Sequence, residues 1–142
     1  MSAPPAFPLQ VFFDGSCSVC AREMEAYRRK ENGGRLLFVD ISAPGFDPTP
    51  YGFTLDAFMY EMHCIDRQGR IYRGVEAFRA IWMAFPSSTR YRLFAVLADL
   101  PVVNSLARFI YRFFARNRKF LTKYRDACGN GKCRIGSNDH KR

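Results

Sequence analysis

The sequence has no long uninterrupted apolar run, which disfavours a simple membrane-spanning helix. In its most apolar stretch, Asp99, Arg108 and Arg112 interrupt the run before the roughly 20 residues that a bilayer requires. The first ten residues also lack the basic and apolar regions of a secretory signal peptide. Five cysteines is an odd number, which disfavours a fully disulfide-paired secreted framework. These absences predict a reducing, cytoplasmic location.

Acidic residues are scarce as well. The chain of 142 residues has a formal net charge of +9, and no acidic residue lies between Arg108 and Arg125. This basic segment has no RNA-binding motif or zinc-finger spacing, so no specific nucleic-acid partner is predicted. We expect Arg108, Arg112 and Arg116 to form either a solvated helix face or a weak contact for an anionic membrane or an acidic protein.

The chain does have ample apolar material for a core. Hydrophobic residues make up 48% and aromatic residues 15% of the sequence, which excludes a disordered protein and a disulfide-stapled miniprotein. The length predicts a single domain, which we place at residues 10–133, with C-terminal helices over about 86–125. Flexible termini are expected over residues 1–9 and 134–142.

The most informative motif is VFFDGSCSVC, residues 11–20. An apolar run that stops at Asp14 predicts a short buried strand, and the residues after Cys17 predict a helix. Cys17 and Cys20 then lie at a strand-to-helix corner, where unpaired backbone N–H groups and the helix dipole stabilise a thiolate. Their i, i+3 spacing places both thiols on one helix face. This position predicts a redox-active dithiol.

Other uses of these cysteines stay open from the residues alone. Cys128 and Cys133 have a spacing compatible with zinc ligands, so with Cys17 and Cys20 they could hold one metal in a zinc-stabilised binding module. The second pair could also form a disulfide, act as a resolving pair, or be structural or incidental. The first pair could be two buried small residues. Haem attachment is excluded because Ala21 stands where histidine is required.

The first part of the chain has the pattern of a βαβ unit. Strands are predicted at residues 10–13 and 35–41, separated by a helix over about 18–30. Ser16 is the expected N-cap of that helix. A strand, a helix and a strand within about thirty residues predict a parallel strand pair with a right-handed crossover.

The following elements extend this unit to an α/β fold. Thr54 can cap a short helix that ends at Tyr60, and residues 62–74 predict a β-hairpin with Gly69 in its turn. A further helix is expected over residues 75–85. This order of elements is that of the thioredoxin fold, in which the redox cysteines follow a strand of the first half.

Two more helices are expected beyond that core. One covers residues 91–100, and Pro101 is well placed to open the next. The second helix is strongly amphipathic, with a face made of Val102, Val103, Leu106, Phe109, Ile110, Phe113 and Phe114. We expect this apolar face to pack on the domain, with the arginines exposed. The alternative is a peripheral membrane protein in which the cysteines act as a redox sensor.

These motifs together resemble the DCC family of thiol-disulfide oxidoreductases, named for a D-x-x-C-x-x-C motif. The motif is present as Asp14, Cys17 and Cys20. Further likeness lies in DISAPGF, MHCIDRQGRIYRGVEAF and YRFFARNRKFLTKYRDAC, so the resemblance covers about residues 10–128. It implies a thioredoxin-like fold with an added C-terminal helical segment. It also implies a redox role for Cys17 and Cys20, without naming a substrate. We therefore expect an enzyme, a thiol-disulfide oxidoreductase of the protein-disulfide reductase type.

The sequence departs from the thioredoxin pattern at one place. Thioredoxin-like proteins usually carry a cis-proline that faces the cysteines and helps to bind the substrate backbone. Counted back from Gly69, that place falls near Glu61, and no proline is there. Substrate binding is therefore expected to differ from that of thioredoxin.

Specific roles are expected for the candidate catalytic residues. Cys17 should lie nearer solvent and attack, and Cys20 should resolve the mixed disulfide. Asp14 either accepts a proton from these thiols or only caps the turn. Cys64 is expected to be a buried filler, and His63 to be structural or half exposed. The expected partners are a protein or small-molecule disulfide and an electron donor, with no cofactor.

Overall fold

Strands and helices are mixed along the first part of the chain and three helices follow in the computed structural model, which describes residues 3–30 and 33–121. In chain order the elements are β1 (Leu9–Phe13), α1 (Ser18–Arg28), β2 (Leu36–Asp40), the 3₁₀ helix η1 (Thr49–Tyr51), α2 (Leu55–Tyr60), β3 (His63–Ile65), β4 (Ile71–Arg73), α3 (Val75–Trp82), α4 (Thr89–Asp99) and α5 (Pro101–Leu121). These elements form a mixed α/β fold consistent with a thioredoxin-like core and a C-terminal helical segment.

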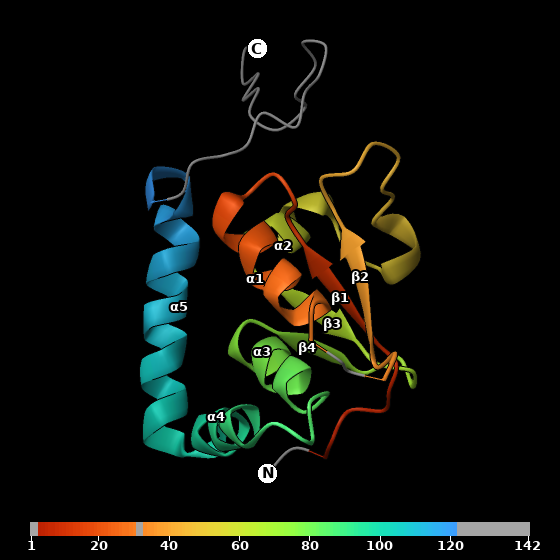
Figure 1. Ribbon diagram of the computed structural model, residues 1–142. Helices are drawn as coiled ribbons and strands as arrows, with labels where there is room; N and C mark the ends of the chain where they lie inside the picture. Colours follow the sequence, from red (N-terminus) through yellow and green to blue (C-terminus); the bar gives the residue numbers. More distant parts are fainter. Residues whose placement is uncertain (1–2, 31–32, 122–142) are drawn as a thin grey trace.

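The strands form a four-stranded sheet in the order β2-β1-β3-β4 (Figure 1). β1 and β2 are parallel, which confirms the predicted βαβ unit with α1 as its crossover. β3 runs antiparallel to β1, and β4 runs antiparallel to β3, which confirms the predicted hairpin. Gly69 lies in the hairpin turn with a φ of 78°, a left-handed conformation that glycine adopts without strain.

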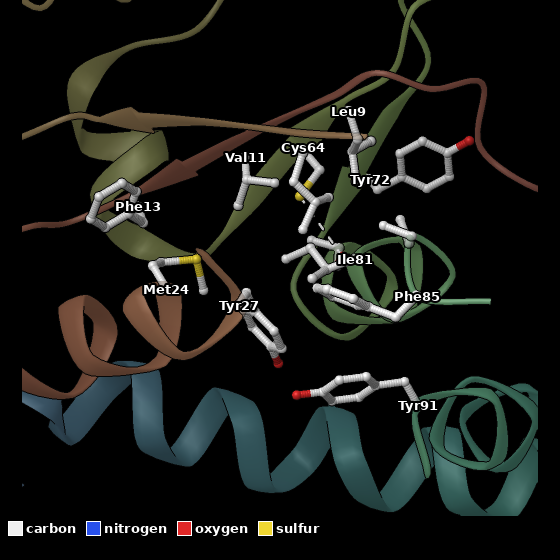
Figure 2. Packing of buried hydrophobic residues seen from close by; sticks show 14 residues of the cluster. Leu9, Val11, Phe13, Met24, Tyr27, Cys64, Tyr72, Ile81, Phe85 and Tyr91 are labelled. Atoms are coloured by element: carbon white, nitrogen blue, oxygen red, sulfur yellow. Dashed lines mark hydrogen bonds between the residues drawn. The ribbon is translucent and has the colours of Figure 1, made fainter. Parts of the chain in front are cut away.

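The central strand β1 is apolar because both of its faces are buried. Leu9, Val11 and Phe13 point to the side covered by α1 and α3, where they pack with Met24 and Ile81, among others (Figure 2). The alternate residue Phe12 points to the other side, where it packs on Ile41 and the α2 residue Phe58. Aromatic rings from the loop between β2 and α2, those of Phe46 and Tyr51, complete this second cluster.

The N-terminal residues that precede β1 and that the structure describes make specific contacts with the rest of the domain. Leu9 is already part of β1 and fully buried. Ala6 donates its backbone N–H to Asp66 in the turn between β3 and β4 and accepts one from Arg67. The flexible terminus expected over residues 134–142 lies outside the described residues.

The two C-terminal helices follow the predicted boundaries closely. α4 packs on α3, where the buried guanidinium of Arg79 lies 2.7 Å from an Asp99 carboxylate oxygen. Pro101 opens α5 as predicted, directly after the bend at Leu100. α5 then runs beside the α1 and α3 side of the domain (Figure 1).

The orientation of α5 contradicts the expectation that its phenylalanine-rich face packs on the domain, except at Phe114, which is half-buried against the domain. Phe109 is 72% exposed and Phe113 is 61% exposed, and their apolar neighbours on the same side are exposed as well. The side that faces the domain carries Asn104, Arg108 and Tyr111 instead. The helix is therefore attached through polar groups together with the ring of Tyr111, which packs on Phe78, and with Phe114.

Within the described residues, no single helix is long and apolar enough to cross a membrane. α4 and the part of α5 up to Asn117 satisfy the length and composition criteria only as a pair, which is bent by 96° at its break.

Candidate redox site

The cysteines lie where β1 gives way to α1, as predicted. Cys17 is itself the N-cap of α1, in place of the predicted Ser16, and its Sγ accepts the backbone N–H of Cys20. The thiol of Cys20 is directed at the same sulfur, with 2.8 Å between the two Sγ atoms. The two cysteines are not joined by a disulfide. An unpaired N–H at a helix start favours negative charge on its acceptor, so this geometry favours a thiolate on Cys17.

The exposure of the two thiols is the reverse of the expectation. Cys17 has 0% of its surface exposed, whereas Cys20 is partly exposed. The prediction that Cys17 lies nearer solvent is therefore wrong. The reason is that Cys17 caps the helix from inside the loop, while Cys20 lies one turn along on the side of α1 that approaches α5.

Asp14 shapes the loop that leads into the cysteines. Its side chain is buried, and Oδ1 accepts both the backbone N–H and the hydroxyl of Ser16. Its backbone carbonyl accepts the N–H of Cys17. These contacts assign Asp14 the turn-capping role that the sequence allowed. Asp14 also borders a small cavity beside Cys20, so its position is compatible with proton exchange as well.

A second aspartate holds the same loop from the neighbouring strand. Asp40, the last residue of β2, accepts the N–H of Gly15 at 2.9 Å and both the N–H and the hydroxyl of Ser42. The approach to Gly15 is so close that a Cβ there would lie 2.0 Å from Asp40 Oδ2. Only glycine fits at this position without displacing the carboxylate. Asp40 is therefore a positioning residue for the dithiol loop.

Helix α5 supplies one wall of the site. A cavity of about 50 Å³ beside Cys20 is bordered by Asp14 and by Tyr111, Phe114 and Ala115 of α5, among others. The hydroxyl of Tyr111 accepts the backbone N–H of Met62 at 2.7 Å.

Glu61 and Met62 line the same cavity. The segment before β3 therefore faces the cysteines, as expected for the place where other thioredoxin-like proteins carry a cis-proline. Glu61 has extended backbone there. The Met62 amide, which a substrate backbone could use, is occupied by the Tyr111 hydroxyl from α5.

His63 and Cys64 are structural residues, in line with the sequence. Cys64 is fully buried, and burial raises the pKa of its thiol far above the usual range. The ring of His63 packs against Phe53 and Phe58 and donates from Nδ1 to the Glu61 carbonyl. Burial lowers the pKa of His63, so the neutral ring is favoured. Neither side chain takes part in the dithiol contacts described above.

The zinc hypothesis receives no support from the described part of the chain. In residues 3–30 and 33–121, no group of three or more His, Cys, Asp or Glu side chains is arranged to hold a metal ion. Cys128 and Cys133, which the hypothesis requires, lie outside the described residues.

Comparison with known proteins fits this site. A model of the DCC1-like thiol-disulfide oxidoreductase family matches residues 11–124. The chain belongs to this family. An uncharacterized chloroplastic protein of Arabidopsis thaliana is 28% identical over 121 residues, which cover 84% of this chain and 55% of the relative. The chain thus spans little more than half of that relative's length. No solved structure matches the chain.

Sequence reasoning did not find Asp40 and Tyr111 of this DCC1-like site, and it expected Phe114 to pack on the domain without placing it beside the cysteines. Asp40 could have been found, since carboxyl ends of neighbouring parallel strands meet at one edge of a sheet and Asp14 follows the other strand. Tyr111 and Phe114 had no such signal, because their contacts depend on how α5 is rotated about its axis.

Proposed function

We propose that the protein is a thiol-disulfide reductase in which Cys17 attacks a disulfide substrate and Cys20 resolves the intermediate. The family supports thiol-disulfide chemistry. The observation that carries the proposal is the 2.8 Å distance between the two Sγ atoms at the start of α1, with Cys17 accepting the Cys20 amide. The sulfur that accepts these bonds is the one best suited to carry negative charge.

The reaction takes place in two exchange steps. The Cys17 thiolate attacks one sulfur of the substrate disulfide, forms a mixed disulfide and releases the other sulfur as a thiolate. Cys20 then loses its proton and attacks Cys17 Sγ, which forms the Cys17–Cys20 disulfide and releases the second substrate thiolate. The substrate gains two electrons and the dithiol loses two. A dithiol or glutathione-type donor must reduce the pair again to complete the cycle.

The burial of Cys17 sets a condition on the first step. Since its sulfur has no exposed surface, the substrate reaches it only after a local opening of the site. The α5 wall is one part that can open, because its contacts with the site are the Tyr111 hydrogen bond and the packing around the small cavity. A cavity of about 50 Å³ is too small for a disulfide substrate as it stands.

Asp14 is proposed to accept the Cys20 proton in the second step. It is buried and borders the same cavity as Cys20, while its Oδ1 is held by Ser16. Asp14→Asn keeps the shape of the side chain and removes its basicity. The expected result is a mixed disulfide that forms at a normal rate and is resolved more slowly, especially near neutral pH. Lost stability with unchanged resolution would assign Asp14 to turn capping alone.

A reducing compartment suits this activity, and we propose the cytoplasm. The Arabidopsis relative is described as chloroplastic, which makes a plastid-like compartment the second candidate for proteins of this kind. The substrate is proposed to be a protein or small-molecule disulfide.

Trapping of the mixed disulfide tests the assignment of the two cysteines. In a background with Cys128→Ser and Cys133→Ser, the Cys20→Ser variant should accumulate a mixed disulfide with oxidised glutathione or a disulfide-containing peptide. Cys17→Ser should accumulate far less. Intact mass and peptide mapping identify the attached residue. Cys64→Ser is the matched control, because that thiol is buried among α3 residues away from the pair, and it should leave trapping unchanged.

Two results would contradict the proposal. Preferential trapping on Cys20 in the Cys17→Ser variant would reverse the roles, as the exposure of the two thiols suggests when taken alone. About one zinc per chain in protein purified without added metal, lost in Cys17→Ser, would favour the binding module.

A further inference from the structure

We propose that α4 and α5 form a docking surface for an anionic membrane. The surface consists of the outward apolar face of α5 and the exposed apolar side chains of α4 that adjoin it at the bend. The outward apolar face is made of Val102, Val103, Leu106, Phe109, Ile110 and Phe113. The exposed side chains of α4 are Leu93, Val96 and Leu97, followed by Leu100 at the bend. The proposal concerns a surface separate from the dithiol and goes beyond the redox function.

The first argument is that the orientation of α5 is fixed by specific contacts on its other side. Asn104 donates to Glu76 Oε1 on α3 and to the Ala98 carbonyl on α4, and Arg108 pairs with the same glutamate. Tyr111 accepts the Met62 amide. Because these polar contacts hold the inner side, the apolar side is held outward. The exposure of Phe109 and Phe113 thus follows from the way the helix is attached.

The second argument is the distribution of charge around the apolar face. Arg112 and Arg116 are exposed and lie along one flank of it, and Arg90 and Arg92 are exposed on α4. Within Pro101–Leu121 there is no acidic residue. A helix of 21 residues, about 30 Å long, with an apolar face flanked by arginines is suited to lie in the plane of a bilayer. Its arginines would then meet anionic headgroups.

The same charges argue against two other ways of covering this face. Two copies of the chain that meet through this face would bring two strongly basic helices close together, and their charges would repel each other. Residues 122–142 supply only Tyr124 and Ile135 as large apolar side chains and are themselves rich in Lys and Arg. An anionic bilayer offers both an apolar interior and the opposite charge.

The test is co-sedimentation of the full chain with lipid vesicles. Vesicles of phosphatidylcholine with phosphatidylglycerol should bind the protein at least tenfold more strongly than phosphatidylcholine alone, and raised salt should reduce this difference. Phe109→Asp with Phe113→Asp should lower binding to the mixed vesicles at least tenfold. Arg112→Glu with Arg116→Glu should abolish the preference for anionic vesicles.

Matched controls separate this proposal from changes in folding and from the redox function. Leu37→Asp alters an exposed apolar side chain of β2, far from α5 in sequence and on another element, and should leave vesicle binding unchanged. Cys17→Ser with Cys20→Ser should bind as the wild type does, so failure of the redox proposal leaves this result intact. Circular dichroism of each variant checks folding.

Several outcomes would overturn the proposal. Absence of vesicle binding by the wild type would do so, as would equal binding to neutral and anionic vesicles. A dimer in light scattering that Phe109→Asp with Phe113→Asp converts to monomer, without vesicle binding, would assign the face to a second copy. Loss of vesicle binding in Leu37→Asp to the same extent would show that the effect is not specific to this surface.

Discussion

Phenylalanine side chains are buried in the sheet domain but largely exposed on the outer side of α5. Phe12 of β1 is 2% exposed and packs in a cluster of aromatic rings, whereas Phe109 of α5 is 72% exposed. The domain side of α5 carries Asn104, Arg108 and Tyr111, with Phe114 beside the redox site. In the domain, apolar residues provide cohesion and polar residues shape the redox loop. In α5, polar residues and Phe114 attach the helix, while most of its apolar residues stay exposed on the outer side.

A pair of phenylalanine substitutions should give the largest difference between the two regions. Phe12→Ala removes a fully packed ring and should lower the free energy of unfolding by about 3 to 5 kcal/mol. Phe109→Ala should change it by less than about 0.5 kcal/mol, because little surface is buried there. Chemical denaturation of both variants measures the contrast. Equal losses would mean that α5 packs through its apolar face in solution, against the structure.

Asp66→Asn should destabilise the domain by about 1.5 to 3 kcal/mol at neutral pH, since several hydrogen bonds to a buried carboxylate are weakened. Burial alone would raise the pKa of Asp66, but hydrogen bonds from Ala6, Arg70 and Gln68 lower it to about 2. The unfolded chain, with a carboxyl pKa of about 3.9, therefore binds more protons in acid.

The stability that comes from Asp66 is thus complete above about pH 4 and is lost as the pH falls through about 2. The difference between Asp66→Asn and wild type should shrink over that window, measured by denaturation at a series of pH values. A difference that stays constant from neutral pH to about pH 2 would show that the substitution acts through packing and not through charge.

Gly15→Ala should cost about 1 to 3 kcal/mol, the usual range for an added methyl group in a closely packed place. The added Cβ would displace the Asp40 carboxylate from the loop. Reactivity of the Cys17–Cys20 pair toward a small disulfide should fall as well, because the loop that orients the helix start is disturbed. Gly45→Ala is a control for glycine replacement in general, because Gly45 is exposed and has open space around it. Its positive φ predicts a small loss of stability for this variant. The reactivity of the cysteine pair should stay unchanged.

The smallest effect is expected for Phe113→Asp, which should change the free energy of unfolding by less than about 1 kcal/mol. The amphipathic pattern alone predicts a marked loss of stability at this position, so the variant separates the two orientations of α5 directly. Thermal unfolding of the isolated protein is the measurement. A drop of many degrees in Tm would show that the apolar face of α5 packs on the domain.

Much of the fold could be predicted because its signals are local. The apolar run before Asp14, the cap at Thr54, the hairpin glycine and Pro101 at a helix start each act within a few residues. The position of the dithiol at a strand-to-helix corner followed from the same signals. The resemblance of the sequence to the DCC family then correctly predicted thiol-disulfide chemistry.

The orientation of α5 could not be predicted, for a physical reason. Hydrophobicity says which helix face avoids water, but not what covers it. The inner side is chosen by long-range contacts such as Tyr111 with Met62 and Asn104 with Glu76, which are 49 and 28 residues apart in the chain. The prediction that Cys17 is more exposed than Cys20 was wrong for a related reason. Whether Ser16 or Cys17 caps α1 depends on Asp14, which holds Ser16 in the preceding turn.

The hydrogen bond from Gly15 to Asp40 links the dithiol to the register of the sheet. Pairing of β1 with β2 places Phe13 opposite Asp40, so the alignment of the two strands determines that the Asp40 carboxylate lies beside Gly15. A slip of β2 by one residue would turn Asp40 to the opposite face of the sheet and leave the Gly15 amide without its acceptor. Thiol reactivity is then a local reporter of correct strand pairing. Chains with misaligned strands would be poorly reactive even while they remain collapsed, which couples redox competence to completed folding.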